Sequence, residues 1–195
     1  IFKLGKKSSS FPWVDFWKHS IGTAMLTREI LSFAEEEFEQ EADYVAGLLH
    51  NLGILILAIT FPDHFSKIYQ QDYKSCPELI ETEKELVGWD HSKIGAYYLW
   101  NHHISEEVVD SIHWHNQPSE AKASPKLASA IQIADHIVRK LGTKGIENYP
   151  VTPDEDYMKL EGWNLLFGEH PEPEAIHSNL KSSLERLGQT LNGVV

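Results

Sequence analysis

The sequence has little cysteine, little positive charge and no long hydrophobic run, and each of these shortages argues against a class of site, partner or location. A single cysteine, Cys76, excludes an intrachain disulfide framework and a zinc site built from cysteines. With 29 acidic against 17 basic residues, the net charge of −12 argues against nucleic acid and membrane as partners, because nucleic acid and anionic lipid are both polyanions. The longest apolar run, at 52–61, is shorter than the about 20 residues that cross a bilayer. These shortages predict a globular protein of the reducing cytoplasm.

Strand-like alternation of polar and apolar residues is also absent, and the patterns that are present are helical. Residues 14–34 carry apolar side chains at helical spacing, with Asp15 placed to cap the helix. An acidic connector at 35–41 separates this helix from a second one near 42–60. Further helices are expected near 62–73, in two pieces of 76–100 with Asp90 capping the second, and at 105–115, 126–142 and 172–192. The sequence therefore predicts an all-α protein.

Eleven histidines are many for this length, and their positions matter more than their number. Four of them and one aspartate lie in apolar helical segments: His19, His50, His91, His115 and Asp135. One buried histidine is most often a satisfied core residue, but five buried polar groups each need a partner, and one shared metal ion or anion would serve them together. Imidazole and carboxylate groups suit iron, manganese, nickel or zinc. Spacing alone leaves a metal site and independent core histidines equally open.

Several segments resemble a known family. "GLLHNLG" at 47–53 is similar to the segment that names the HD superfamily of metal-dependent phosphohydrolases. Along residues 13–141, the order and spacing of six segments resemble the HDOD branch, the HD-related output domain of bacterial signalling proteins: "FWKHS", "AGLLHNLGILIL", "FPDHF", "ELVGWDHSKIGAYYLWNHHI", "SIHWHNQP" and "ASAIQIADHIV". The resemblance implies an HD-domain-like helical bundle.

The resemblance also implies a division of the chain. Residues 1–12 would be a linker from an N-terminal helical part that HDOD domains usually carry and that this sequence lacks. Residues 13–142 would form the HD-like core, and residues 143–195 a C-terminal loop and terminal helix.

The ligand set of the HD enzymes can be carried over residue by residue. By resemblance, His19, His50 and Asp135 match the metal ligands of the HD superfamily. His91 and His115 match the additional histidines with which the HD-GYP phosphodiesterases hold further metals. The candidate metal-site residues implied by the resemblance are His19, His50, Asn51, His91, His115 and Asp135.

Three positions depart from the enzymes. Asn51 replaces the aspartate of the His-Asp pair, Ile54 replaces a lysine of the HD-GYP enzymes, and Asn116 replaces the second histidine of a later pair. An amide offers a carbonyl oxygen but no charge, so Asn51 binds a hard divalent cation less well than a carboxylate does. A site that lacks this charge and a phosphate-binding lysine is a poor hydrolase.

Three hypotheses follow. The first, which we favour, is a signal-transduction output module of HDOD type that is catalytically degenerate and acts by binding other signalling proteins or a nucleotide-type ligand. The second is a metal-dependent phosphohydrolase or phosphodiesterase acting on nucleotides or cyclic dinucleotides. The third is a purely structural helical domain without metal. The sequence leaves open whether the protein is an enzyme and whether it forms oligomers.

Helical periodicity makes one geometric prediction. The polar groups lie on the apolar stripes of their helices, which in a bundle face the other helices. We therefore expect four side chains to converge on one pocket, with two more at its edge: His19, His50, Asn51 and Asp135, then His91 and His115. Without a metal, His50 should hydrogen-bond Asp135 or a water.

Overall fold

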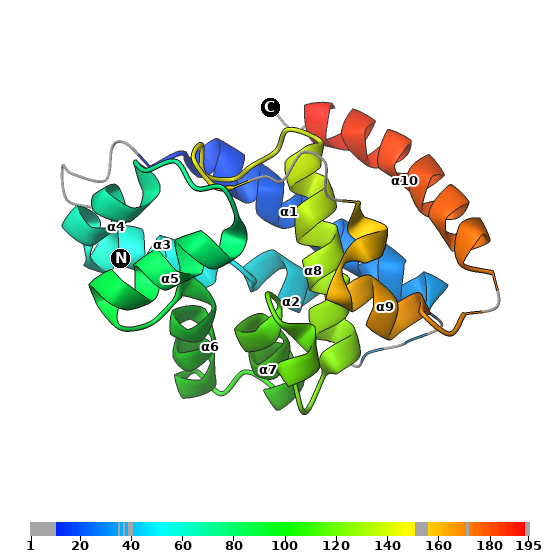
Figure 1. Ribbon diagram of the computed structural model, residues 1–195, viewed down its shortest axis with the longest axis horizontal. Helices are drawn as coiled ribbons and strands as arrows, with labels where there is room; N and C mark the ends of the chain where they lie inside the picture. Colours follow the sequence, from blue (N-terminus) through cyan, green and yellow to red (C-terminus); the bar gives the residue numbers. More distant parts are fainter. Residues whose placement is uncertain are drawn as a thin grey trace.

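The computed structural model describes residues 11–34, 36, 38, 41–150, 156–170 and 172–193. Over these residues the protein consists of helices and loops without any strand, which confirms the all-α class (Figure 1). The linker predicted at 1–12 lies almost entirely outside the described residues, as does part of the acidic connector predicted at 35–41.

Two long helices form the axis of the molecule. α8, Pro125–Lys140, runs through its middle, and α1, Trp13–Phe33, packs against α8 and crosses behind it (Figure 1). α1 also packs against α2, Ala42–Leu49, while α8 packs against α7, Glu106–Trp114, and α9, Glu161–Phe167. The main hydrophobic cluster lies among these helices. A polar residue on the inner face of α1 or α8 is therefore placed in the interior.

A second group of helices lies beside this axis: α3, Leu52–Thr60, α4, Pro62–Tyr69, α5, Cys76–Val87, and α6, His91–Asn101. α3 and α6 approach closely at Gly53, where an added Cβ would lie 1.8 Å from the backbone oxygen of His91. Only a glycine allows this approach. It brings the start of α3 next to the start of α6, and so brings His91 near the segment that carries His50.

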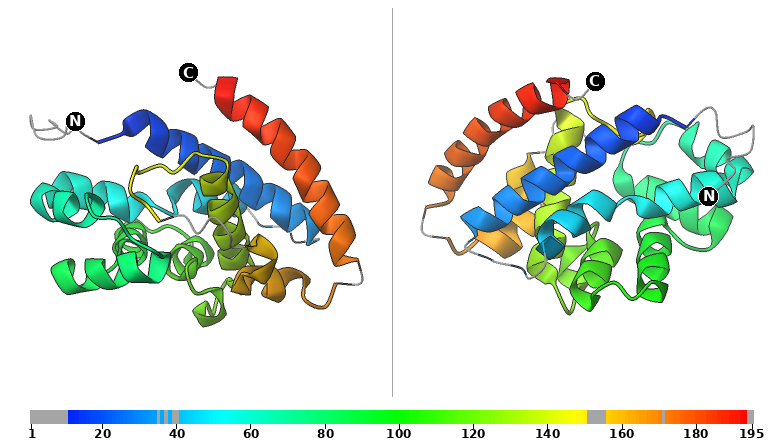
Figure 2. Two further views of the ribbon diagram at one scale, coloured as in Figure 1. Left: turned by 45° about the horizontal axis from the view of Figure 1, so that its top comes forward. Right: turned by 180° about the vertical axis from the view of Figure 1, so that it is seen from behind.

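The C-terminal part adds two short 3-10 helices and a long final helix. η3, Pro118–Glu120, precedes α8, and η4, Tyr157–Lys159, precedes α9. α10, Pro173–Gly193, arches along one side of the molecule and contacts α1 (Figure 2). Its Ile176 and Leu180 are buried in the main cluster. That cluster therefore contains residues from both sides of position 142, and the boundaries at 12 and 142 stay predictions.

Two elements differ from the sequence prediction. α1 begins at Trp13 after Pro12, so the prediction that Asp15 caps it was wrong. Asp15 lies in the first turn instead, where its carboxylate faces the positive end of the helix dipole. α9 lies in a segment predicted to be loop, because its seven residues are too few for a helical period to show in the sequence. Asp90 caps α6 as predicted, accepting from the backbone N–H of Lys93 at 2.9 Å.

By length and composition alone, residues 42–60 are long and apolar enough to cross a membrane. In the structure they form two helices rather than one, and these helices pack within the bundle: α2 against α1, α7 and α8, and α3 against α6. Core helices of globular proteins meet the same two criteria, so this segment is only weak evidence for a membrane span.

Candidate metal centre

His50 and Asn51 do not lie inside one helix, as the sequence predicted, but in a break between α2 and α3. The His50 ring competes with the backbone for a carbonyl group at this break. Its Nδ1 lies 2.8 Å from the backbone oxygen of Gly47, the carbonyl that the N–H of Asn51 would bond in a continuous helix. The side chain therefore ends α2 and turns Nε2 toward the interior, where His50 and Asn51 are almost completely buried.

His19 lies in the middle of α1 and is completely buried. Its Nδ1 lies 2.8 Å from the backbone oxygen of Thr143, in the loop that follows α8. Gly145 of the same loop, with a φ of +78°, lies against the imidazole ring, and an added Cβ would be 3.1 Å from His19 Cγ. The loop therefore covers His19 and fixes the orientation of its ring.

Asp135 of α8 meets both histidines through one carboxylate oxygen. Its Oδ1 lies 2.8 Å from Nε2 of His19 and 3.1 Å from Nε2 of His50, and the two Nε2 atoms are 3.3 Å apart. The amide nitrogen of Asn51 lies 3.3 Å from Nε2 of His19. The four groups expected to converge do so, and His50 contacts Asp135.

The protonation state of the two imidazole rings makes their close approach to Asp135 unusual. Carbonyl oxygens accept from Nδ1 of both His19 and His50, so each ring carries its proton there and presents the Nε2 lone pair to Asp135. Burial, reinforced by the positive charge of Arg139, lowers the pKa of His19 to about 4, so this ring is neutral at pH 7. Contacts between two lone pairs are favourable only when a proton or a metal ion lies between them.

Arg139, one turn after Asp135 on α8, is a member of the site that the sequence reading missed. Its Nε donates to Oδ2 of Asp135 at 3.0 Å, and its Nη2 lies 2.7 Å from Oδ1. Burial alone would raise the pKa of Asp135, but the positive charge of Arg139, together with the contacts to His19 and His50, holds it well below its usual value. The i, i+4 spacing of the two residues could have indicated the pair.

His91 and His115 lie beside this group and are buried as well. The centroid of the His115 ring is 5.4 Å from that of His50 and 5.8 Å from that of His91. His115 ends α7 as His50 ends α2, with Nδ1 lying 2.8 Å from the backbone oxygen of Ile112. Burial lowers the pKa of His115 to about 3, so this ring is neutral at pH 7, and its Nε2 lies 3.1 Å from the side-chain amide nitrogen of Asn116.

Glu83 of α5 holds His91 in place and was also missed. This buried carboxylate accepts from Nδ1 of His91 at 2.7 Å, from the backbone N–H of His91 at 2.9 Å, and from the hydroxyl of Tyr69. Burial would lower the pKa of His91, but Glu83 outweighs it and raises the pKa. The buried side-chain atoms of the site that lack a hydrogen-bond partner, among the described residues, are Nε2 of His91, Oδ1 of Asn51 and Nη2 of Arg139, whose approach to Asp135 is an ion pair without hydrogen-bond geometry.

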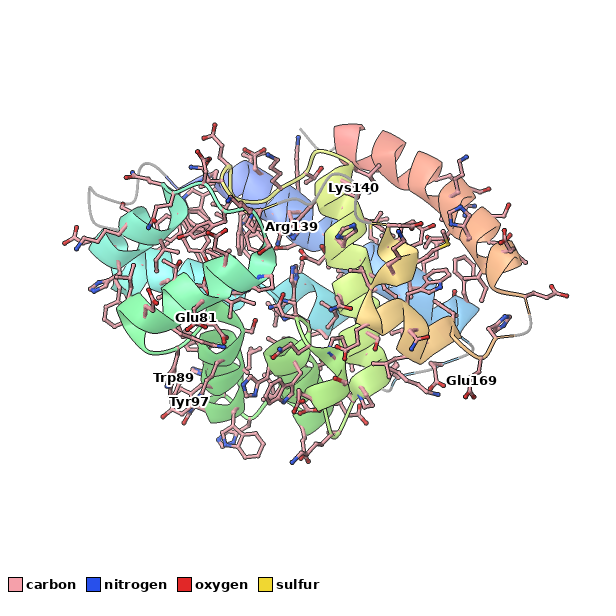
Figure 3. The ribbon with its side chains drawn as sticks, in the orientation of Figure 1. Glu81, Trp89, Tyr97, Arg139, Lys140 and Glu169 are labelled. Carbon is pink, nitrogen blue, oxygen red and sulfur yellow. The ribbon has the colours of Figure 1, made fainter. Side chains whose placement is uncertain are left out.

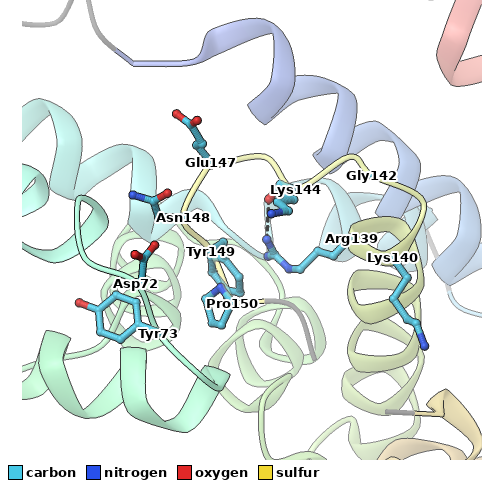
Figure 4. A pocket seen from close by; sticks show the side chains of 10 residues that line it. All are labelled: Asp72, Tyr73, Arg139, Lys140, Gly142, Lys144, Glu147, Asn148, Tyr149 and Pro150. Atoms are coloured by element: carbon cyan, nitrogen blue, oxygen red, sulfur yellow. Dashed lines mark hydrogen bonds between the residues drawn. The ribbon is translucent and has the colours of Figure 1, made fainter. Parts of the chain in front are cut away.

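The site borders two cavities. One, of about 690 Å³, reaches Asp135 and Arg139 and is also lined by Cys76, Asn116 and Tyr149. The other, of about 520 Å³, is lined by Arg139, by residues of the loop that covers His19, and by Asp72 and Tyr73 (Figure 4). Figure 3 shows Arg139 pointing from α8 toward the middle of the molecule, whereas Trp89 and Tyr97 lie at its outer edge. A small ligand in either cavity would touch Arg139.

The donor atoms fit a divalent metal ion. With ligand bonds of about 2.0–2.2 Å, neighbouring ligand atoms lie roughly 2.8–3.5 Å apart. The three distances among His19, His50 and Asp135 fall within that range. Carbonyl oxygens that fix Nδ1 are also the usual second partners of metal-bound histidines. Asn51 is the exception, because its amide nitrogen rather than its oxygen faces His19.

Comparison with known proteins identifies the family of the chain. The family model of the HDOD domain matches residues 1–118, which is more than half of the chain. The chain belongs to the HDOD family. The matched range contains His19, His50, His91 and His115, and ends before Asp135.

Solved structures share the fold at low sequence identity. An HDOD domain protein of unknown function from Geobacter sulfurreducens has a TM-score of 0.72 and 22% identity, over 93% of this chain and 63% of its own. A protein from Shewanella amazonensis, named as a candidate phosphohydrolase, has a TM-score of 0.70 and 22% identity, over 100% and 66%. A protein from Marinobacter aquaeolei, named as a candidate signal transduction protein, has a TM-score of 0.70 and 19% identity, over 100% and 41%.

A curated relative covers less of the chain. An uncharacterized protein of Treponema pallidum (strain Nichols) is 30% identical over 101 residues, which is 50% of this chain and 19% of the relative. The chain thus spans about a fifth of that relative and less than two thirds of the solved structures that it matches.

Proposed function

We propose that this HDOD domain is a signal-transduction module whose histidine site binds rather than catalyses. It would transmit a signal in the bacterial cytoplasm, either by contacting other signalling proteins or by binding a small nucleotide-type ligand. The names of two solved neighbours support a signalling or hydrolase ancestry for the fold. The single cysteine is consistent with a reducing compartment.

The orientation of Asn51 carries the proposal. Nε2 of His19 is an acceptor because Nδ1 holds the proton, so the nearer amide atom at 3.3 Å is the donor Nδ2. An HD enzyme needs a charged ligand at this position, and here the side chain offers a hydrogen-bond donor to a ligand histidine. The amide thus occupies the lone pair that a metal would use, which weakens metal binding and hydrolysis together.

The test is a turnover assay combined with a metal assay. Purified protein supplied with Mn²⁺ or Zn²⁺ should hydrolyse cyclic dinucleotides and nucleotide phosphates far more slowly than about 1 per second, an ordinary enzyme rate. Asn51→Asp should raise the bound metal, because a carboxylate replaces the amide. Asn101→Asp makes the same change at an exposed position of α6 and should leave metal content unchanged. Turnover by the unaltered protein at about 1 per second or faster would overturn the proposal.

A second candidate is a metal-dependent phosphohydrolase, and one observation favours it. Two histidine lone pairs and a carboxylate oxygen converge within 3.3 Å of one another, a donor set suited to His19, His50 and Asp135 holding a metal ion. The chemistry that a divalent ion supplies at such a site is Lewis-acid activation of water. His19 and His50 would be oriented for this role by Thr143 and Gly47. Stoichiometric metal in protein purified without chelators would favour this candidate.

A further inference from the structure

Both oxygens of Asp135 are engaged by one internal cation. Arg139 approaches the carboxylate side-on, with Nε at 3.0 Å from Oδ2 and Nη2 at 2.7 Å from Oδ1. Oδ1 is also the oxygen that faces Nε2 of His19 and of His50. The guanidinium therefore neutralises the same atom that a metal held by these histidines would need.

Arg139 is itself held in place by the segment after α8. Its Nη1 donates to the backbone oxygen of Lys144 at 2.6 Å, and the guanidinium carbon lies 3.3 Å from the centroid of the Tyr149 ring (Figure 4). The side chain is only 4% exposed. These partners hold the guanidinium facing Asp135.

The segment 143–150 closes over the site through three further contacts. Thr143 accepts from Nδ1 of His19, Gly145 lies against the same ring, and the side-chain amide of Asn148 lies 3.3 Å from the backbone oxygen of Tyr69. We call residues 143–150 the cover loop. Because it bonds to Arg139 as well as to His19, its position depends on where the guanidinium lies.

We propose that Arg139 is an internal counter-ion that competes with a divalent metal ion for Asp135, and that the cover loop responds to which of the two is bound. This inference rests on the proposed function, since it describes how the binding site would be regulated. If a metal ion were held at Oδ1, two cations would face one carboxylate, and the guanidinium would withdraw toward the cavity of about 520 Å³ that Arg139 also lines. The contact with Lys144 is then lost and the cover loop loosens.

The competition is tested by removing the charge of Arg139. Arg139→Gln should bind Zn²⁺ about 10- to 100-fold more tightly than the unaltered protein, the factor expected for a lost charged hydrogen-bonding competitor. The measurement is a calorimetric titration with Zn²⁺ on the full chain, with metal content checked by elemental analysis. Arg28→Gln is the matched control, because Arg28 makes the same two contacts to Asp43 outside the site, and it should leave Zn²⁺ affinity unchanged.

A structural role for Arg139 predicts the opposite result. If the guanidinium merely supports Asp135 as a ligand, its removal loosens the site and Zn²⁺ binds the same or less tightly, which would overturn the inference. Because Arg139→Gln leaves Asp135 buried without its counter-ion, the variant can fail to fold. Arg139→Lys then serves instead: it keeps the charge, but an ammonium group cannot hold both oxygens and Lys144 together. It should bind Zn²⁺ several-fold more tightly, and equal or weaker binding overturns the inference.

Hydrogen exchange tests the cover loop separately. In the unaltered protein at saturating Zn²⁺, amides of residues 143–150 should exchange faster than they do without Zn²⁺, relative to the helices, because the guanidinium has then left Lys144. Slower or unchanged exchange overturns the part of the inference that concerns the loop. The proposed function fails on a different measurement, since it depends on turnover of phosphate substrates and not on Zn²⁺ affinity.

Discussion

Two aspartate–arginine pairs in this protein have nearly the same contact distances and very different surroundings. Arg28 of α1 contacts Asp43 of α2 side-on at 2.9 and 3.0 Å, as Arg139 contacts Asp135 at 3.0 and 2.7 Å. Each guanidinium also lies over a tyrosine ring. The Arg28 side chain, however, is 44% exposed and that of Arg139 is 4% exposed.

Burial, and not contact geometry, therefore decides what each pair does. Water and salt screen the Arg28–Asp43 pair, so it contributes little beyond joining α1 to α2. The Arg139–Asp135 pair carries two charges in the interior that cannot be separated without a large cost. A charge that is costly to leave unpaired is suited to a site where another cation can replace the partner.

The largest expected effect comes from breaking the buried pair. Asp135→Asn should lower the free energy of unfolding by about 3–5 kcal/mol, because it leaves Arg139 buried and charged without its counter-ion. Asp43→Asn should cost less than about 1 kcal/mol. Urea unfolding measures both. Adding Arg139→Gln to Asp135→Asn should recover much of the loss, and similar losses for the two aspartates would contradict the comparison.

A smaller effect is expected where the cover loop meets the site. Gly145→Ala forces an alanine into a positive φ and places its Cβ 3.1 Å from His19 Cγ, so it should cost about 1–3 kcal/mol. Gly142→Ala is the matched control, because its φ is +90° and an added Cβ meets nothing within 4 Å. The difference between the two variants in urea unfolding isolates the contact with His19. Equal losses would show that the loop does not press on that ring.

The smallest effect is the pH dependence of the exposed pair. Burial alone would raise the pKa of Asp43, but hydrogen bonds from Arg28 and the backbone outweigh it and lower the pKa. A lowered folded pKa means that the pair stabilises the protein above the unfolded value, near pH 4, and loses this as pH falls through the folded pKa.

Unfolding of the unaltered protein and of Asp43→Asn measures this dependence. Their difference should be about 0.5 kcal/mol at pH 7, should shrink below pH 4, and should also shrink in 1 M salt. A difference that persists at pH 2 would contradict the assignment.

Helical periodicity was sufficient to predict which polar groups meet. His19 and Asp135 lie on the buried stripes of long regular helices, so their directions follow from spacing alone. The break at His50 could not be predicted in the same way, because it depends on a ring nitrogen replacing one backbone N–H at Gly47. Arg139 was within reach of sequence reasoning, since it is four residues from Asp135.

Other parts depended on contacts between distant segments. Glu83 lies in the run "ETEKELV", which has the composition of a solvated helix face, and it is buried only because Tyr69 and His91 are brought to it. The residues around Gly145 and Pro150 predicted a loop but not its course, because glycine and proline indicate how a chain turns and not what it covers.

The hydrogen bond between His50 and the backbone of Gly47 has a consequence for the choice of variants at position 50. One imidazole both stops a helix and supplies a lone pair, so His50→Ala would remove the lone pair and could also fuse α2 and α3 into one rod. A change in binding in that variant would then have two causes. His50→Asn separates them, because a short amide can still donate to the carbonyl three residues back while it offers no imidazole nitrogen. The break between α2 and α3 and the lone pair in the interior therefore both depend on this one side chain.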